Sequence, residues 1–287
     1  MDVKVRFIGA LNGAIAAACY GMNPLFALPL YSAGADVNSV LFYRYIIATF
    51  VLWLYLKFVK KYCFKLTREE ILPLIIMGLI FSFSSITLFK SYTYMDAGIA
   101  STILFIYPIL VAVIMAVFFK EKLLYSTVIS LLLTTAGVVL LYHGNPAQSL
   151  SPVGVLLVFL SALSYAIYIV GVKNIHALRT LNSKKLIFYV MLFGSSIYIY
   201  NVIFNTKLYI ITEPHLWINV LALSILPTIV SLIAMTISIK IIGSTAAAVL
   251  GALEPITAIF FGVVVFHEQL TPRIIVGIIT ILFAVLM

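Results

Sequence analysis

Long apolar runs fill most of the 287-residue chain and are separated by short polar stretches. Each run has about 20 residues, the length that an α-helix needs to cross the hydrocarbon core of a bilayer. We predict ten transmembrane helices, at residues 7–30, 38–59, 71–92, 98–119, 123–142, 153–173, 186–206, 216–239, 244–266 and 272–287. The last run stops abruptly at Met287, which leaves a continuation of the natural chain open.

The composition agrees with a chain that lies in lipid. Hydrophobic residues make up 64% of it and charged residues 9%, against roughly 25% charged in ordinary soluble proteins. The predicted fold class is an all-α integral membrane protein with ten transmembrane helices. The first run resembles a lipoprotein signal that ends at Cys19, but the apolar residues continue past Cys19, so we expect the first spanning helix there.

A stretch near the C-terminus repeats one in the first half. At an offset of 147 residues, Pro108 matches Pro255, Glu121 matches Glu268, Leu123 matches Leu270, Ala100 matches Ala247, Ile109 matches Ile256 and Phe119 matches Phe266. A weaker echo at an offset of 145 residues pairs Gly9, Leu11, Ala17 and Tyr20 with Gly154, Leu156, Ala162 and Tyr165. Duplicated halves are typical of membrane transporters. We predict two domains of five helices each, residues 1–146 and 147–287.

The positive charges predict the orientation of the helices. With the N-terminus inside, fourteen of the 18 Lys and Arg residues fall on the inner side. Only Lys207 and Arg273 fall on the outer side, while Arg44 and Lys90 lie within helices. Because cytoplasmic loops are enriched in Lys and Arg, both termini are predicted to be cytoplasmic.

An odd number of helices in each half has a consequence for the topology. The second half enters the membrane from the side opposite to the first, so the two halves are predicted to be inverted repeats. This is the plan of many secondary transporters, in which the binding site lies near the bilayer midplane between the repeats.

Glu254 is the foremost candidate for a functional side chain. It lies inside an apolar run, where a charged group costs roughly 2.5–3.5 kcal/mol on insertion scales, and Pro255 follows it. Ala247, Gly251 and Ala258 share its helix face, and a stripe of small residues faces other helices or a cavity rather than lipid. Glu254 is either a substrate or proton-coupling group, or a neutral structural acid bonded to a freed backbone carbonyl.

Three further polar residues lie within the predicted helices. Asn23 precedes Pro24, and it either offers an unwound backbone to a substrate or caps the break. Tyr107 occupies the position of Glu254 in the first half, and Tyr165 matches Tyr20. Since tyrosines also form belts at the membrane interface, each tyrosine by itself is a weak candidate.

Two cations complete the candidate set. Arg44 lies near the outer end of the second predicted helix, where it either binds a carboxylate or extends its side chain to the interface; we prefer the second interpretation. Lys90 lies near the outer end of the third predicted helix and is either a functional cation or a simple partner of Asp96.

The sequence offers little support for an enzyme. It contains no HExxH motif, no glycine-rich phosphate loop and no cluster of Cys and His. Cys19 and Cys63 have no metal-ligand spacing and are predicted to be free thiols. We therefore expect no cofactor, no metal and no nucleic-acid partner; the expected partners are a small-molecule substrate, the lipid bilayer and, as a candidate coupling ion, the proton.

At the repeated stretches the sequence resembles the EamA-type family of the drug/metabolite transporter superfamily. Residues 93–123 and 242–286 carry the resemblance, and the Pro-x12-Glu-x-Leu core of each is its most specific part. Arg44 lies where the family often has an arginine in the second helix, whereas the matching position of the seventh helix is Tyr189. The resemblance covers essentially the whole chain.

The resemblance implies an inner-membrane transporter, commonly an exporter of amino acids or other small metabolites, that works by alternating access. It also implies a central cavity lined mainly by helices 1, 3, 4, 6, 8 and 9. Asn23, Tyr107, Tyr165 and Glu254 would lie near that cavity.

Three functions are compatible with these features. The first is a secondary transporter of small metabolites, with Glu254 as the coupling or substrate-contact group. The second is a proton-linked exporter of cationic or toxic compounds, which the intramembrane acid and the many aromatic residues would also serve. The third is a membrane receptor or scaffold that transports nothing, against which the short loops argue.

Overall fold

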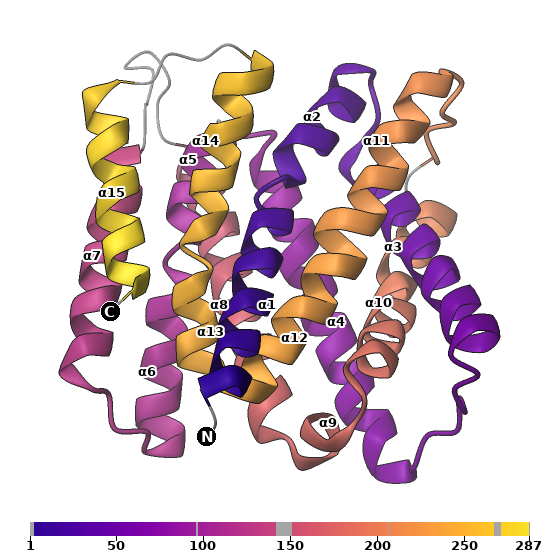
Figure 1. Cartoon of the computed structure of the whole chain (residues 1–287). Helices are drawn as coiled ribbons and strands as arrows, with labels where there is room; N and C mark the ends of the chain where they lie inside the picture. The colour runs from indigo at the N-terminus through magenta and orange to yellow at the C-terminus, as the bar shows by residue number, and fades with distance from the viewer. Residues whose placement is uncertain (1–2, 96, 142–150, 206, 267–270, 287) are drawn as a thin grey trace.

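The computed structural model describes residues 3–95, 97–141, 151–205, 207–266 and 271–286, which form helices joined by short turns (Figure 1). In the first half the helices are α1 (Val3–Tyr20), α2 (Asn23–Ser32), α3 (Val37–Leu54), the π-helical turn η1 (Tyr55–Val59), α4 (Arg68–Ser91), α5 (Ala97–Leu104), α6 (Tyr107–Phe119) and α7 (Tyr125–Leu141). In the second half they are α8 (Pro152–Asn174), α9 (His176–Thr180), α10 (Ser183–Phe204), α11 (Pro214–Ser224), the π-helical turn η2 (Ile225–Val230), α12 (Ser231–Ile242), α13 (Ser244–Leu250), α14 (Leu253–Phe266) and α15 (Pro272–Leu286).

Most of the predicted spans are confirmed as long apolar helices. Within the described residues, eight helical segments are long and apolar enough to cross a membrane, counting helices that continue through a short break as one. Two of the predicted helices, at 123–142 and 272–287, correspond to the shorter apolar helices α7 and α15. Large apolar side chains cover the outer surface, among them Phe118 at 75% and Phe204 at 69% exposure. Such a surface is stable in contact with lipid rather than water.

The predicted helices are not all continuous, and proline explains the main differences. The runs at 7–30, 98–119 and 244–266 are each divided into two helices, because a proline near the start of the second helix lacks the backbone N–H that would continue the first. The run at 216–239 contains η2, which includes Pro227. The short helix α9 lies outside all predicted runs.

Five pairs of helices make the most extensive packing contacts: α1 with α12, α4 with α8, α7 with α15, α4 with α10, and α3 with α10. Figure 1 shows α7 and α15 together at one edge of the molecule and α3 near α10 at the opposite edge. Each pair joins a helix of residues 3–141 to a helix of residues 152–286. The two halves of the chain are therefore interleaved, and the core lies between them.

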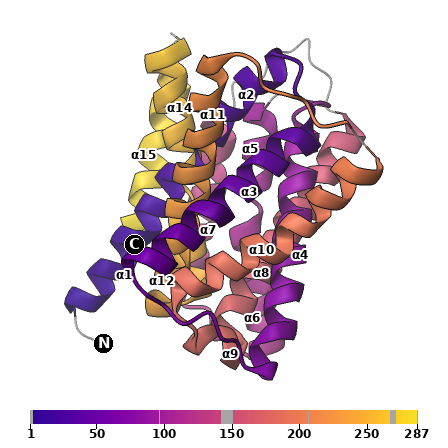
Figure 2. The same ribbon diagram turned by 90° about the vertical axis from the view of Figure 1, so that its right-hand side faces the viewer.

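The helices α1 and α8, which the weaker sequence echo relates, run in opposite directions. In Figure 1, α1 rises from the lower side, where the N-terminus lies, whereas α8 descends to α9 at the lower side. Figure 2, turned by 90°, shows the same relation, with α9 at the foot of α8.

Serine hydroxyls join two of these helix pairs in matching ways. The Ser84 hydroxyl of α4 donates to the Ser161 carbonyl of α8 at 3.0 Å, and the Ser231 hydroxyl of α12 donates to the Ala16 carbonyl of α1 at 2.9 Å. Ser231 lies 147 residues after Ser84, and Ser161 lies 145 residues after Ala16. The spacing is the same as that of the sequence repeat, so the two bonds occupy equivalent places.

A tyrosine of α3 and a tyrosine of α10 each donate a hydrogen bond to a loop of the other half of the chain. The Tyr43 hydroxyl donates to the Tyr209 carbonyl at 3.0 Å, in the loop between α10 and α11. The Tyr189 hydroxyl donates to the Phe64 carbonyl, in the loop between η1 and α4. In Figure 1 the first loop lies toward the upper side and the second toward the lower side. Each half thus supplies one tyrosine that fixes a loop of the other half.

Glycine brings α7 and α15 into backbone contact. A Cβ added at Gly137 would lie 3.0 Å from the Gly277 carbonyl oxygen and 2.6 Å from the Ile281 side chain, and a Cβ at Gly277 would lie 2.9 Å from the Gly137 carbonyl oxygen. These approaches are closer than a side chain permits, so a larger residue must separate the helices. Stripes of small residues are the usual means by which membrane helices approach one another.

We expect Gly137→Leu to destabilise this helix pair. Overpacking of a close contact typically costs about 1–3 kcal/mol, so the melting temperature of the purified protein in detergent should fall by several degrees. The matched control is Ala136→Leu, because Ala136 is the neighbouring residue and is exposed. A melting temperature that falls equally in both variants, or in neither, would contradict the packing described here.

Candidate functional site

Three breaks in the helices lie around one region of the interior. The breaks separate α1 from α2, α5 from α6, and α13 from α14, and each consists of two residues. Pro24, Pro108 and Pro255 lie within the first three residues of the helices that follow. Proline is tolerated in the first turn of a helix, where its missing N–H is not needed. The breaks therefore place new helix starts, and the polar residues beside them, inside an otherwise apolar structure.

Glu254 and Tyr107 meet at two of these helix starts. The Tyr107 hydroxyl donates to Oε1 of Glu254 at 3.1 Å. Tyr107 is fully buried and Glu254 is 7% exposed. Glu254 lies in the first turn of α14, where the positive end of the helix dipole favours a carboxylate. The two residues are 147 residues apart, the offset of the sequence repeat, so equivalent positions of the two halves contact each other here.

Glycine makes the approach of Tyr107 to α13 and α14 possible. A Cβ added at Gly251 would lie 1.5 Å from the Tyr107 hydroxyl oxygen. A Cβ added at Gly21 would lie 2.4 Å from the Glu254 carbonyl oxygen. Contacts this short are impossible for any residue with a side chain, so Gly251 and Gly21 allow the helix breaks to lie against each other.

Aromatic rings surround the hydrogen bond between Tyr107 and Glu254. The Tyr107 and Tyr165 ring centroids are 4.9 Å apart, and Tyr165 stacks on Tyr20 with centroids 5.7 Å apart and rings inclined by 4°. Tyr20 and Tyr165 are 145 residues apart and form the second contact between positions that the repeat relates. The ring centroids of Tyr165 and Tyr168 are 6.3 Å apart, and the two rings are nearly parallel.

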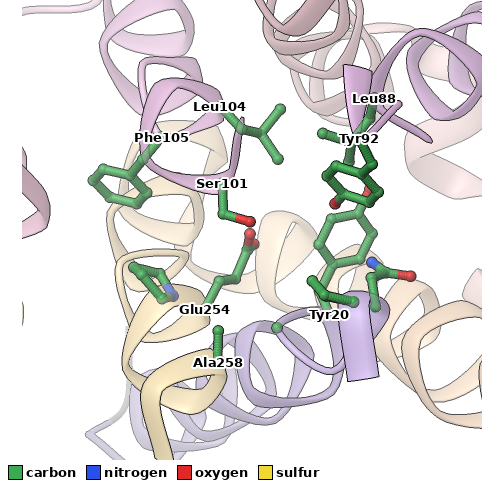
Figure 3. Close-up of a pocket in the computed structure, with 12 residues that line it drawn as sticks. Tyr20, Leu88, Tyr92, Ser101, Leu104, Phe105, Glu254 and Ala258 are labelled. Atoms are coloured by element: carbon green, nitrogen blue, oxygen red, sulfur yellow. The ribbon is translucent and has the colours of Figure 1, made fainter. Parts of the chain in front are cut away.

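A pocket lies beside Glu254, between the helix breaks. Its lining residues are Tyr20, Gly21, Asn23, Pro24, Leu88, Tyr92, Ser101, Leu104, Phe105, Glu254, Pro255 and Ala258. Figure 3 shows Glu254 directed toward Ser101 on one wall, with Tyr20 and Tyr92 on the opposite wall. The pocket is narrow and has room for about one water molecule in this conformation. It therefore combines one acid with hydroxyls and apolar surface.

Asn23 is a second polar group in the pocket wall. It is 2% exposed, and neither its side-chain nitrogen nor its oxygen has a hydrogen-bond partner among the described residues. Buried amide groups are normally paired, and an unpaired one is costly. The Asn23 amide is therefore available to a molecule in the pocket, as a donor and as an acceptor.

Arg44 lies inside the protein and does not extend to the membrane interface. Its side chain is fully buried in α3, its Nε donates to Oγ1 of Thr228 at 2.6 Å, and its guanidinium carbon lies 5.2 Å from the centre of the Phe89 ring. The interfacial position preferred from the sequence is wrong. Arg44 lies in the third turn of its helix rather than at the helix end, and Thr228 of η2 holds it inward.

The sequence candidates thus fall into three groups. Glu254 and Asn23 line the pocket. Tyr107 donates a hydrogen bond to Glu254, and the Tyr165 ring packs against the Tyr107 ring. Arg44 is buried but is not among the lining residues. Lys90 is exposed and does not line the pocket, and its suggested partner Asp96 lies outside the described residues.

Sequence reasoning missed several residues of the pocket wall. Tyr92 and Phe105 directly follow helices and Ser101 lies within α5, and all three belong to common residue types, so no local pattern distinguishes them. Tyr20 was noticed in the sequence because it matches Tyr165 in the repeat, but such a match by itself does not indicate a functional site. Across the ranges that the structure describes, no group of His, Cys, Asp and Glu is arranged to hold a metal ion.

Comparisons with known proteins agree with this architecture. The EamA-like transporter family matches the chain twice, at residues 7–143 and 152–287. A crystal structure whose title names no function superposes with a TM-score of 0.81, over 96% of this chain and 94% of the other, at 16% sequence identity. At that identity the likeness shows the fold alone. No curated protein matches the chain in sequence.

The two family matches together cover nearly the whole chain, and the apolar helices make it an integral membrane protein. The chain belongs to the EamA-like transporter family.

Proposed function

We propose that this protein is a secondary active transporter that exports small metabolites such as amino acids across the cytoplasmic membrane by alternating access. The observation that carries the proposal is the buried contact of Glu254 with Tyr107, which joins the two halves of the chain beside a pocket. An acid inside a membrane protein is costly and is typically retained for a substrate or an ion. Membership of a transporter family gives the general class, and the contact of Glu254 with Tyr107 supports the proposed role.

The division of the chain into two inverted repeats of five helices, residues 1–146 and 147–287, is part of this proposal. The opposite directions of α1 and α8 support it, as do the equivalent serine bonds and the tyrosine bonds to loops of the opposite half. In transporters of this plan the substrate site lies at the interface of the repeats. On this proposal a pseudo-two-fold axis relates the two repeats. Two pairs of residues lie close to it: Tyr107 with Glu254, and Tyr20 with Tyr165.

The pocket gives a physical route to alternating access. It lies among α2, α5 and α14, toward the upper side in Figure 1, opposite to the side of the N-terminus. If the N-terminal side is cytoplasmic, the pocket is nearer the outer face. Since the two halves are inverted copies, the same helix breaks allow a related movement that opens the pocket toward the cytoplasm. Glu254 would accompany the substrate between the two states.

The orientation proposed from the Lys and Arg distribution places both termini and the loop with Cys63 in the cytoplasm. Cys63 is exposed, so it can report the side of the membrane directly. We expect a membrane-impermeant maleimide to label Cys63 in a Cys19→Ala background only after the cells are opened. The matched control is His215→Cys in a background without cysteines, because the His215 side chain is 68% exposed on the predicted outer side and should be labelled in intact cells.

Labelling of Cys63 in intact cells, together with protection of the cysteine at 215, would reverse the orientation. Direction of transport would then have to be assigned again, whereas the position of the site would be unaffected.

We expect Glu254→Gln to remove ligand binding without unfolding the protein. A hydrogen bond to a charged group contributes about 1.5–3 kcal/mol, so affinity for an amine-bearing ligand should fall roughly 10-fold to 150-fold. The measurement is a thermal-shift screen of purified protein with amino acids, polyamines, nucleosides and cationic dyes at pH 6 and pH 8, since a ligand that binds only the folded state raises the melting temperature.

The matched control for this variant is Glu121→Gln. Glu121 accepts a hydrogen bond from Thr245 at 3.2 Å and does not line the pocket, so ligand stabilisation should remain. Equal stabilisation by the same ligand in wild type and Glu254→Gln would exclude Glu254 as a ligand or coupling group.

Gly251 and Tyr107 should act on transport through the same contact. Gly251→Ala places a methyl group against the Tyr107 hydroxyl and should displace it from Glu254, whereas Tyr107→Phe removes the bond directly. We expect either change to reduce transport in proteoliposomes, and the double variant to be little worse than Tyr107→Phe. Losses that simply multiply would indicate that Gly251 acts elsewhere.

A second function, export of cationic compounds, is favoured by one observation. The stacked rings of Tyr20 and Tyr165 lie beside the acid, and aromatic faces attract organic cations. In the same screen, stabilisation by dyes or polyamines but not by amino acids would support this function over metabolite export. The non-transporting receptor receives no support from any feature of the site.

A further inference from the structure

The C-terminal end of α3 and the turn η1 carry aromatic side chains followed by lysines. Phe50, Trp53 and Lys57 recur at intervals of three and four residues, so they share one face of the helix. Phe50 and Lys57 are exposed, and Figure 1 shows α3 at the edge of the molecule. The surface therefore changes from aromatic to cationic along the helix axis. We call these residues the α3 rim: Phe50, Trp53, Lys57, Phe58, Lys60 and Lys61.

The ammonium group of Lys57 is held between two rings of the α3 rim. Its Nζ lies 4.6 Å from the centre of the Trp53 ring and 5.4 Å from the centre of the Phe58 ring. The Trp53 and Phe58 centroids are 6.2 Å apart, and Phe50 stacks on Trp53 with centroids 6.1 Å apart. Tryptophan is enriched at the level of the lipid headgroups in membrane proteins. The contacts thus place the Lys57 ammonium at the boundary between hydrocarbon and water.

No acid accompanies the lysines of the α3 rim along the chain. Residues 37–68 contain no Asp or Glu, whereas residues 57–68 contain four lysines and Arg68. In the part of the chain that the structure describes, the ion pair within 4.0 Å is that of Glu213 with His215. The positive charge of the α3 rim is therefore not neutralised by a carboxylate of the described residues, and it is available to an external anion.

The end of a helix at this position does not by itself require lysines. In the proposed arrangement of two repeats, α10 corresponds to α3. It also ends in exposed aromatic residues, Tyr200 and Phe204, whose centroids are 4.9 Å apart. The last turn of α10 has no basic residue, however, and Asn205 follows it. Figure 2 shows α3 ending toward the lower side and α10 ending toward the upper side. The aromatic end is thus common to both helices, whereas the lysines belong to one side of the membrane.

We propose that the α3 rim binds an anionic phospholipid in the leaflet on the N-terminal side of the protein. The acyl chains of the lipid pack on Phe50 and Trp53, and the phosphate pairs with the lysines. The order of aromatic and cationic residues along the helix matches the order of acyl chain and headgroup in the lipid. Basic clusters beside membrane helices attract anionic lipids, and the cytoplasmic leaflet is rich in them. This inference is independent of the proposed transport function.

The chain has two tryptophans, Trp53 and Trp217, so lipid contact with the α3 rim can be measured directly. In Trp217→Phe, Trp53 is the remaining fluorophore, and bromine atoms on acyl chains quench it when the lipid lies against it. The full-length variant is reconstituted in phosphatidylcholine vesicles, in which brominated phosphatidylglycerol or brominated phosphatidylcholine replaces a rising fraction of the lipid. We expect the anionic lipid to reach half-maximal quenching at an about fivefold lower fraction, the effect of roughly one lysine near a charged membrane surface.

Variants in this Trp217→Phe background identify the lysines responsible. Lys57→Gln combined with Lys61→Gln should lower the preference for the anionic lipid to about twofold or less. The matched control is Lys120→Gln combined with Lys122→Gln, because these lysines are exposed in another loop at the lower side of Figure 1. Lys61 and Lys120 even share a left-handed backbone, with φ of 50° and 53°. The control removes the same charge and should keep the fivefold preference.

Four results would overturn the proposal. The first is equal quenching of Trp53 by the two lipids, and the second is an unchanged preference in the Lys57→Gln and Lys61→Gln variant. The third is the same preference at Trp217 in the reciprocal variant Trp53→Phe, which would show attraction to the whole protein. The fourth is reversal of the quenching by soluble glycerophosphoglycerol, which would indicate a site for a free phosphate ester rather than a lipid.

Single substitutions serve if the double variant does not fold. Lys57→Gln should lower the preference for the anionic lipid, and Lys57→Arg, which keeps the charge, should retain it. Equal preferences in these two variants would contradict the role of the charge. Because both leaflets of the vesicles have the same lipids, the result depends neither on the orientation of the protein nor on its transport activity.

Discussion

The hydrogen bond between Tyr107 and Glu254 is the interaction around which the interior is arranged. Both groups are buried where the apolar helices break, and a buried polar group without a partner is costly, so each stabilises the other. The bond forms because Gly251 and Gly21 let the breaks touch and because prolines start new helices there. Tyrosine rings pack around the bond, and a narrow pocket lies beside it.

The repeat explains why the site lies where it does. Two pairs of residues that the sequence repeat relates are in contact: Tyr107 with Glu254, and Tyr20 with Tyr165. In the proposed arrangement of inverted repeats, such contacts form near the axis that exchanges the halves. Tyr20 and Tyr165 are the same residue in both halves. Tyr107 and Glu254 differ, so only the second half supplies an acid at this position. On the proposal of inverted repeats, a symmetric framework holds an asymmetric candidate site.

The sequence predicted the framework better than the site. Apolar run lengths identified most of the spanning helices, and an acid within such a run indicated Glu254, because both signals are physical consequences of lipid. The offset of 147 residues, a consequence of duplication, then led to Tyr107. The burial of Arg44 could not be predicted, since its position depends on Thr228, a residue 184 positions away that approaches only when α3 and η2 pack. The pocket residues Tyr92 and Ser101 were invisible for the same reason: nothing in their neighbours along the chain records what faces them across the helix breaks.

The measurement that tests the central claim most directly is solute movement by the purified protein in proteoliposomes under an imposed pH gradient. An equimolar mixture of amino acids, nucleosides and polyamines is enclosed, and the external medium is analysed by mass spectrometry over time. The account predicts that zwitterionic amino acids leave the vesicles faster than from protein-free vesicles, and that the pH gradient changes the rate. Release of every solute at the protein-free rate, from vesicles in which the protein is shown to be folded, would contradict it.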